Sequence, residues 1–340
     1  MTAGSPNSLR EGIGQEAVVR AAVYHRFGGP EVVHVEEWPK PVPKAGEVLI
    51  RVRATTVSMA DYRMRSRDLP KGLGFLAPIA LGIFAPRHKV LGMDLAGTVE
   101  AVGPGVTRFQ PGDEVIAMPG PEFAAHAEYK AMPETGAVAL KPANMSFEEA
   151  VTLVFGGQPA LTYLQRANTR AGEGVLVNGA SSAVGTAAVQ IAKFLGATVT
   201  GVTSGRNAEL VRSLGADHVI DYEHEDFATT GRQYDVVMDC VGNAPFERVD
   251  RAIKPGGALL LVVVDLKGML GAAGNARRSG QLVNARAVTP RSEDLAFLTR
   301  MAEAGKFKPV IDRRYTLDEI AEAHRYLDTG RKRGNLVVSL

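Results

Sequence analysis

The hydrophobic and polar positions of this 340-residue chain follow two different patterns. From Ala21 to about Leu140, short runs of alternating polarity, such as 48–53, stand between Gly and Pro turns, which is typical of half-buried strands. Beyond residue 140, apolar strands alternate with amphipathic helices, and this spacing predicts βαβ units and a parallel sheet. The strands at 175–177 and 259–264 are apolar throughout, as expected where both faces of a sheet are covered.

The pattern also predicts where individual elements lie. Helices are expected at 146–153, 161–167, 183–195, 207–214, 245–253 and 293–304, and a last one after the capping box Thr316-Leu-Asp-Glu319. Strands are expected at 94–102, 175–179, 198–203, 219–220, 235–239, 258–264 and 336–338. Two Gly-, Ala- and Leu-rich segments, 66–90 and 265–284, fit neither period, and we expect lids and pocket walls or helices packed on the core.

These elements divide the chain into two domains of class α/β. Residues 1–18 are mixed and polar, and we expect a disordered arm there, without the apolar run of a signal peptide. Residues 19–140 and 308–340 are expected to form a small β-barrel domain. Residues 141–307 are expected to form a doubly wound parallel sheet of the Rossmann type.

Composition excludes several classes of partner. Thirty-nine basic and thirty-seven acidic side chains leave a net charge of +2 without a basic block, so neither a nucleic acid nor a membrane surface is expected as a partner. The longest apolar run, 72–86, is broken by Pro78 and is too short to span a bilayer. Cys240 is the only cysteine, which excludes a disulfide framework and a Cys-rich zinc site and fits a cytoplasmic location.

The most informative stretch runs from Val175 to Gly185. It reads as a buried strand, a tight turn of small residues and the start of a helix, which places backbone N–H groups and a helix N-terminus where a pyrophosphate can bind. The residues expected at the pyrophosphate are Ala180, Ser181, Ser182, Ala183, Val184 and Gly185. Ser182 stands where such turns usually have their middle glycine. Its hydroxyl can donate to the phosphate, or its side chain can weaken binding of the pyrophosphate.

About twenty residues further on, the chain indicates which dinucleotide binds. An NAD-binding fold has Asp or Glu there to accept from the ribose 2′-OH. This chain instead has Ser204-Gly-Arg206, and a hydroxyl with a guanidinium suits the 2′-phosphate of NADPH. Tyr222, just past the next strand, is a further candidate for flanking this phosphate.

Other site chemistries lack support. The seven histidines show no metal-ligand spacing, so no metal site is predicted. A serine nucleophile is not indicated either, because the Gly-x-Ser-x-Gly elbow is missing.

Motifs from Val19 to Leu340 together resemble the medium-chain dehydrogenase/reductase superfamily, in its zinc-free branch of quinone oxidoreductases. They are Ala22-Val-Tyr, Val57-Ser-Met-Ala-Asp-Tyr62, Leu91-Gly-Met-Asp-Leu-Ala-Gly97 with Gly103, Pro111-Gly-Asp-Glu-Val115, the 180–185 turn with Ala188-Val-Gln-Ile-Ala192, Leu214-Gly-Ala-Asp217, Asp239-Cys-Val-Gly242, Pro255-Gly-Gly257 and Gly334-Asn-Leu-Val-Val338. The resemblance implies a GroES-like β-barrel domain, a Rossmann domain and an active-site cleft between them.

The resemblance also implies roles for single residues. Zinc-binding relatives have Cys at Ser58 and His-Glu at Met93-Asp94, and they carry a four-cysteine lobe that this chain lacks. Residues expected near the nicotinamide or elsewhere along the cofactor are Thr162, Val241, Gly242, Val263, Val264 and Asn335. Many relatives dimerise through the last strand of the Rossmann sheet, here 282–288, so a homodimer is expected.

The function predicted from these features is hydride transfer from NADPH to an activated C=C bond or a quinone. Without zinc, a conjugated acceptor needs only hydrogen-bond donors, because its charge spreads as an enolate or quinol. Tyr62, Ser58 and Asp61 are the predicted catalytic residues, and the apolar segment 73–79 predicts a hydrophobic, uncharged substrate. Two alternatives stay open: a metal-free NADP-dependent alcohol or ketone oxidoreductase, and an NADPH-binding sensor or interaction protein with vestigial activity.

Overall fold

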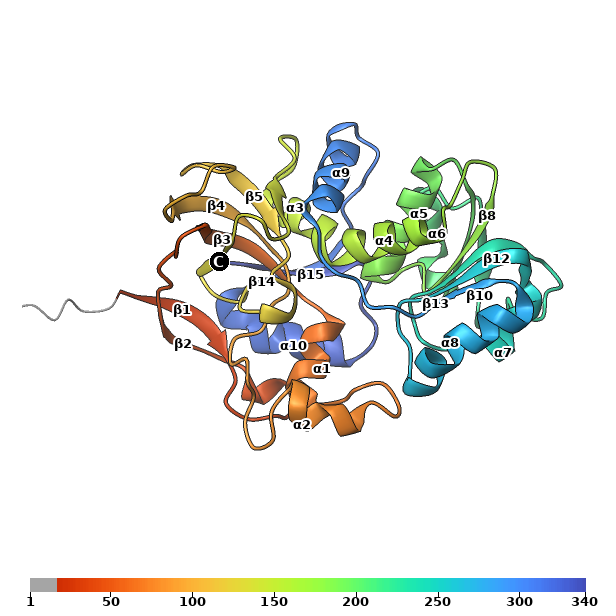
Figure 1. The fold of residues 1–340 in the computed structure, drawn as a ribbon, viewed down its shortest axis with the longest axis horizontal. Coiled ribbons are helices and arrows are strands. Elements are labelled where there is room, and N and C mark those ends of the chain that lie inside the picture. Colours follow the sequence, from red (N-terminus) through yellow and green to blue (C-terminus); the bar gives the residue numbers. More distant parts are fainter. Residues whose placement is uncertain (1–16) are drawn as a thin grey trace, which may run out of the picture.

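The computed structural model describes residues 17–340, with the side chains of Leu76 and Ala80 excepted. A β-rich half and a parallel α/β half lie side by side, joined by helices α3 (Phe147–Thr152) and α4 (Gln158–Arg166) (Figure 1). The architecture is the predicted one, a GroES-like barrel domain beside a Rossmann domain. Residues 1–16 of the predicted disordered arm lie outside the described residues. The first strand begins at Val18.

The Rossmann half contains one six-stranded, fully parallel sheet with the order β10-β9-β8-β11-β12-β13. Its strands are β8 (Gly174–Asn178), β9 (Thr198–Thr203), β10 (His218–Asp221), β11 (Tyr234–Asp239), β12 (Ile253–Leu261) and β13 (Leu282–Asn284). The strand order reverses between β8 and β11, and open α/β sheets bind ligands at the carboxyl ends of the strands at such a point. The apolar centre of β8, with Val175, Leu176 and Val177, is completely buried, as its composition predicts.

Helices cover both faces of this sheet. They are α5 (Ala183–Phe194), α6 (Ala208–Ser213), α7 (Phe246–Val249) and α8 (Leu266–Ser279), whereas α9 (Ser292–Glu303) packs on α4. The helix expected at 245–253 is shorter, because a 3-10 turn replaces its second half at 250–252. The strand expected at 258–264 begins earlier and ends at Leu261.

The unassigned segment 265–284 is helix α8 followed by the edge strand β13. Asp265 caps the helix by accepting from the backbone N–H of Gly268 at 2.7 Å, and Gly280 ends it with a φ of 71°. Three glycines inside α8 lower its intrinsic helix propensity, which explains why its period is weak in the sequence. Its stability therefore depends on packing against the sheet.

The barrel half is built on a seven-stranded sheet with the order β14-β15-β3-β4-β5-β7, and β6 also pairs with β3. These strands are β3 (Glu47–Val57), β4 (Leu95–Val102), β5 (Glu114–Ala117), β6 (Tyr129–Pro133), β7 (Val138–Leu140), β14 (Ile311–Thr316) and β15 (Asn335–Ser339). A separate ribbon pairs β1 (Val18–Val23) with β2 (His34–Pro39). The last thirty residues thus complete a sheet that begins near residue 47.

The unassigned segment 66–90 contains a 3-10 turn at 74–76, the short helix α2 (Ala77–Ala80) and irregular chain. It follows helix α1 (Met59–Ser66), which packs on α10 (Ile320–Asp328). Arg65, completely buried, donates from Nη2 to both carboxylate oxygens of Asp328 at 2.6 and 2.7 Å, and this ion pair joins the two helices. Among residues 17–340, no helix combines the length and the apolar character needed to cross a bilayer.

Candidate active site between the two halves

The turn after β8 has the geometry that the sequence predicts. Gly179 adopts a φ of 79°, and Ser182 caps α5 by accepting from the backbone N–H of Gly185 at 3.0 Å. A Cβ on Gly185 would lie 2.1 Å from the carbonyl oxygen of Gly179, so only glycine allows this approach. Because the first helical N–H groups have no partner within the helix, the N-terminus of α5 can bind an anion.

A cavity of about 610 Å³ lies over this turn and the end of β9. Of the residues predicted to bind the cofactor, it is lined by Ser181, Ser182, Ser204, Arg206, Tyr222 and Val241. Arg206 and Tyr222 are exposed, whereas Ser204 is buried and accepts from Asn207 Nδ2 at 3.2 Å. The residue directly after β9 is Ser204 and not Asp or Glu, so a guanidinium and hydroxyls face the cavity there, and Glu225 and Asp226 line it further away along the chain.

The remaining residues of the predicted pyrophosphate turn do not line this cavity with their side chains. Ala180 and Ala183 are buried, and Val184 and Gly185 lie in the first turn of α5. They therefore fix the backbone and contribute no side chain to this cavity.

The sequence analysis missed the cations of the closing segment, Arg331 and Lys332, which line the same cavity. The backbone N–H of Gly334 donates to the carbonyl of Ser181 at 2.8 Å, which holds this segment on the turn. Lys332 Nζ donates to the carbonyl of Gly334 at 2.8 Å, and burial lowers the pKa of Lys332 to about 8. The run Arg331-Lys-Arg333 was the available signal, but only the fold shows which chain segment it faces.

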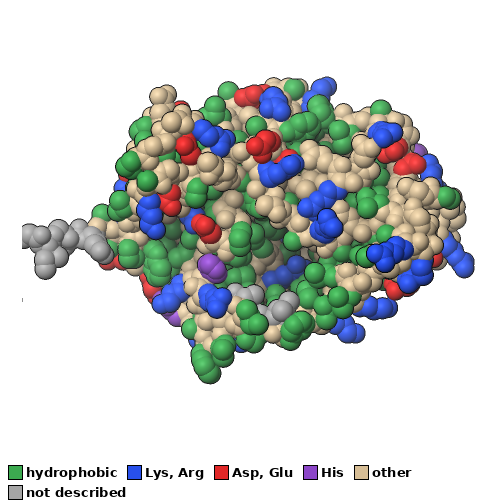
Figure 2. Space-filling view, in the orientation of Figure 1, with side chains coloured by type: hydrophobic (Ala, Val, Ile, Leu, Met, Phe, Trp, Pro, Cys, Tyr) green, Lys and Arg blue, Asp and Glu red, His purple; other side chains and the backbone are tan. Residues whose placement is uncertain are grey.

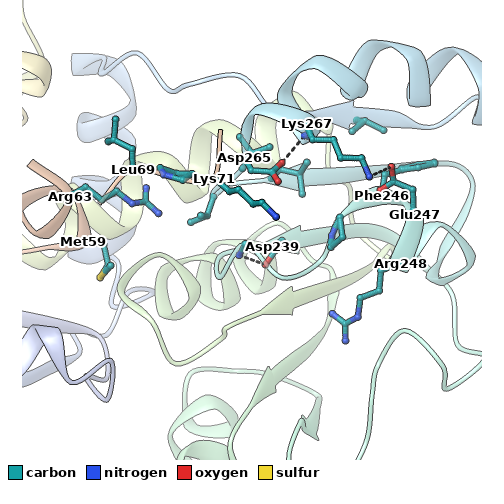
Figure 3. A pocket seen from close by; sticks show the side chains of 18 of the residues that line it. Met59, Arg63, Leu69, Lys71, Asp239, Phe246, Glu247, Arg248, Asp265 and Lys267 are labelled. Carbon is teal, nitrogen blue, oxygen red and sulfur yellow. Dashed lines mark hydrogen bonds and ion pairs between the residues drawn. The ribbon is translucent and has the colours of Figure 1, made fainter. Parts of the chain in front are cut away.

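A second cavity, of about 810 Å³, lies between the two halves, where the surface is hollowed in Figure 2. The Rossmann half contributes Gly242, Val263 and Val264, all predicted near the nicotinamide, and the barrel half contributes α1 and the chain after it. Arg248 lines both cavities, so they adjoin each other. Figure 3 shows Arg63 and Lys71 reaching into this space from the barrel half, opposite Asp239, Glu247 and Lys267.

The loop after β11 is shaped by Asp239. Its buried carboxylate accepts from the backbone N–H groups of Val241 and Gly242 at 3.0 Å and of Ala244 at 2.9 Å. Gly242 adopts a φ of 93°, which favours glycine at this position. The Asp239 carboxylate therefore fixes the backbone of the loop that lines the larger cavity.

The predicted catalytic residues separate into two groups. Ser58 and Asp61 form the capping box of α1, in which the Ser58 hydroxyl donates to Asp61 at 2.6 Å, and Gly92 N–H donates to Asp61 at 2.8 Å. Both are buried and do not line the larger cavity. Tyr62 does line it, but its hydroxyl donates to Asp68 at 2.9 Å, and this hydrogen bond raises the pKa of Tyr62. This geometry favours a positioning role for Ser58 and Asp61 and weakens the case for Tyr62 as an acid.

Arg63, which the sequence analysis missed, is the more accessible donor. It lies one residue after Tyr62 on α1, is half-buried and lines the larger cavity. Within residues 17–340 its guanidinium makes no hydrogen bond or ion pair, and burial lowers the pKa of Arg63 slightly without removing its charge. A guanidinium in this position can donate to a substrate oxygen.

Thr162 and Asn335, two further predicted cofactor residues, also lie outside both cavities. Thr162 donates to the Gln158 carbonyl at 3.0 Å and faces a separate cavity of about 320 Å³ beside Arg291. Asn335 is buried in β15 and donates to the Val310 carbonyl at 3.1 Å. The structure does not bring either side chain to the cleft, and their role toward the cofactor stays a prediction.

Zinc-binding members of the superfamily that this sequence resembles have metal ligands at positions 58, 93 and 94. The side chains at these positions in this chain do not form a zinc site. Ser58 is engaged with Asp61, and Met93 offers only a thioether. Asp94 is buried and accepts from the hydroxyl of Thr56 at 2.6 Å and from its backbone N–H at 2.8 Å. Burial raises the pKa of Asp94 to about 7. Because both of its oxygens accept from Thr56 of β3, this carboxyl group joins β3 to the start of β4.

Comparison with known proteins agrees with this geometry. The alcohol dehydrogenase GroES-like domain family matches residues 44–154, and the zinc-binding dehydrogenase family matches residues 214–338. The chain is 34% identical to a 2-methylene-furan-3-one reductase from Solanum lycopersicum over 336 residues, covering 94% of this chain and 79% of the relative. It is 33% identical to a chloroplastic NADPH-dependent alkenal/one oxidoreductase from Arabidopsis thaliana, with the same coverage.

A solved structure shows the same arrangement of both halves. The quinone oxidoreductase from Coxiella burnetii superposes with a TM-score of 0.84 at 29% identity, covering 95% of this chain and all of the other. The chain therefore belongs to the medium-chain dehydrogenase/reductase superfamily of nicotinamide-dependent oxidoreductases.

Proposed function

We propose that this enzyme uses NADPH, without zinc, to reduce an activated C=C bond or a quinone. One observation carries the proposal: the cavity over the 180–185 turn, which contains the N-terminus of α5 and several cations, adjoins the larger cavity lined by Gly242, Val263 and Val264. When bound, the reduced nicotinamide supplies the hydride. The names of the tomato and Arabidopsis relatives, a methylene-furanone reductase and an alkenal/one oxidoreductase, support this class of acceptor.

The preference for NADPH rests on the smaller cavity. Arg206 and the hydroxyl of Ser204 replace the acid that accepts from a ribose 2′-OH in NAD-binding folds. Arg331 and Lys332 add positive charge from the closing segment. A guanidinium binds a phosphate through two parallel charge-assisted hydrogen bonds, so this set suits a 2′-phosphate better than a hydroxyl.

The larger cavity supports a conjugated acceptor. Met59, Leu69, Val263 and Val264 provide apolar contacts for its carbon skeleton. Arg63 can donate to the carbonyl or quinone oxygen, where negative charge develops during reduction, and its unpaired guanidinium needs no rearrangement to do so. A saturated ketone would form a localised alkoxide, for which Ser58, Met93 and Asp94 offer no Lewis acid.

Paired substrates test this function directly. Purified enzyme with NADPH is expected to reduce an enone or quinone and to leave the matching saturated ketone nearly untouched. Arg63→Met should lower kcat for the enone by about 10²–10³, because one donor to the developing oxyanion is lost. The measurement is NADPH oxidation at 340 nm with product identification, with and without a chelator.

Tyr62→Phe is the matched control, and it should leave kcat near the wild-type value, because the Tyr62 hydroxyl already donates to Asp68. A large loss in Tyr62→Phe with an active Arg63→Met would transfer the donor role to Tyr62. Equal turnover of the saturated ketone would favour the alcohol or ketone oxidoreductase alternative, and inhibition by the chelator would contradict zinc independence. Tight NADPH binding without turnover of any acceptor would favour a sensor or interaction protein.

Arg206→Ala tests the choice of dinucleotide. Loss of a charge-assisted hydrogen bond worth about 1.5–3 kcal/mol should weaken NADPH binding by roughly 10- to 100-fold and leave NADH binding nearly unchanged. Fluorescence titration with both coenzymes measures the effect. Arg212→Ala, an exposed arginine on α6 outside the cavity, is the control, and equal losses for NADPH and NADH in Arg206→Ala would exclude the assignment.

Lys332 should make NADPH binding depend on pH. Its pKa of about 8 in the free enzyme means that the ammonium group is present below pH 8 and is lost as the pH rises. The dissociation constant of NADPH should therefore rise above pH 8, by up to about tenfold per pH unit, because phosphate binding needs the protonated form.

Lys332→Met should bind NADPH more weakly at pH 7 and lack this rise between pH 7.5 and 9.5. Arg331→Met should bind more weakly but retain the rise, because arginine stays protonated throughout this range. A pH profile in Lys332→Met that parallels the wild type would show that another group titrates.

We propose a cytoplasmic homodimer. The strand expected to mediate dimerisation, β13, lies at the edge of the Rossmann sheet, where its outer backbone groups can pair with a second copy. Light scattering should give twice the chain mass of 36.2 kDa, and a mass of one chain would contradict the proposal. The single cysteine, with its pKa raised by burial, suits a reducing compartment.

A further inference from the structure

Two histidines and a glutamate gather on the β1–β2 ribbon, apart from both cavities. His34 and Glu36 lie two residues apart on β2 and therefore project from the same face of the strand. His34 pairs with Val23, the last residue of β1, and His25 follows two residues later. Strand pairing thus brings together three potential ligands from two segments of chain.

The three side chains converge on one point. His25 Nε2 lies 3.1 Å from each carboxylate oxygen of Glu36, and His34 Nε2 contacts one of the same oxygens. One ligand atom from each side chain lies within 4.8 Å of the other two. Ligands of a tetrahedral Zn²⁺ at about 2.0–2.2 Å from the metal are about 3.4 Å apart, so small side-chain shifts suffice to accommodate the ion.

A backbone contact orients His34. Its Nδ1 lies 3.3 Å from the carbonyl oxygen of Val32, which is a suitable acceptor for the Nδ1–H group. In the neutral ring, Nε2 then carries a lone pair that points at the carboxylate of Glu36. A proton or a metal ion between the two atoms removes the repulsion of their lone pairs. Metal-bound histidines commonly have their other nitrogen bonded to a carbonyl in this way.

We propose that His25, His34 and Glu36 bind one divalent transition-metal ion, such as Zn²⁺. Two imidazoles and one carboxylate form a ligand set that Zn²⁺ prefers, and the fourth position is open to water. Both histidine side chains are about half exposed, so the ion can exchange with solvent. The site lines neither cavity of the cleft and is independent of the proposed reduction.

Zinc titration of untagged, chelator-treated enzyme tests the proposal. Calorimetry at pH 7.5 should show one Zn²⁺ bound per chain, and Co²⁺ should give the visible absorption of a tetrahedral complex. His34→Ala should weaken Zn²⁺ binding by at least about tenfold, since loss of a ligand costs no less than loss of its outer hydrogen-bond partner. The Glu36→Gln variant, which loses the carboxylate ligand but retains both imidazoles, should also bind Zn²⁺ more weakly.

His224→Ala is the matched control. His224 is also an exposed histidine beside a carboxylate, with Nδ1 3.0 Å from Asp221, but it has no second imidazole nearby, so this variant should bind Zn²⁺ like the wild type. Circular dichroism of the metal-free variants checks that the ribbon folds. Equal Zn²⁺ affinity of the wild type and His34→Ala would overturn the proposal. The side chains would then share only a proton.

Discussion

The close backbone contact between the 180–185 turn and the closing segment holds this structure together. Gly334 N–H donates to the Ser181 carbonyl, and Gly334 also forms a bridge with Ser182. A Cβ on Gly334 would lie 2.4 Å from the Val310 carbonyl, and its φ is 57°, so only glycine allows the contact. Since β15 begins directly afterwards and pairs with β3, this contact fixes the Rossmann turn relative to the barrel sheet.

The cleft follows from this arrangement. On one side of the contact, Arg331 and Lys332 line the same cavity as the turn and the residues after β9, and they add positive charge to it. On the other side, the Arg65–Asp328 ion pair ties α1 to the same C-terminal part of the chain and so places Arg63 over the floor of the larger cavity. Arg65 is completely buried whereas Asp328 is partly exposed, so removing Asp328 would leave a buried guanidinium without its partner, which makes the pair a constraint on α1.

The two cavities differ in how they recognise a ligand. The smaller one uses backbone N–H groups, hydroxyls and cations, which suit the fixed phosphates of a dinucleotide. The larger one combines apolar side chains with the unpaired guanidinium of Arg63 and further charged side chains, Lys71 among them, so it offers both apolar contacts and donors to an oxygen.

The sequence alone determined the parallel sheet, the 180–185 turn and the absence of an acid directly after β9, because apolar strands, glycines and helix caps are local signals. It did not reveal α8, whose glycines weaken the period, and it did not reveal that Ser58 and Asp61 form the capping box of α1, because a helix cap and a catalytic pair use the same residue types. Only the tertiary structure brought Arg63, Arg248 and Lys332 to the cleft and His25 to Glu36. These residues are far apart in the sequence or lie in ordinary charged positions, and strand pairing and domain contact decide which of them meet.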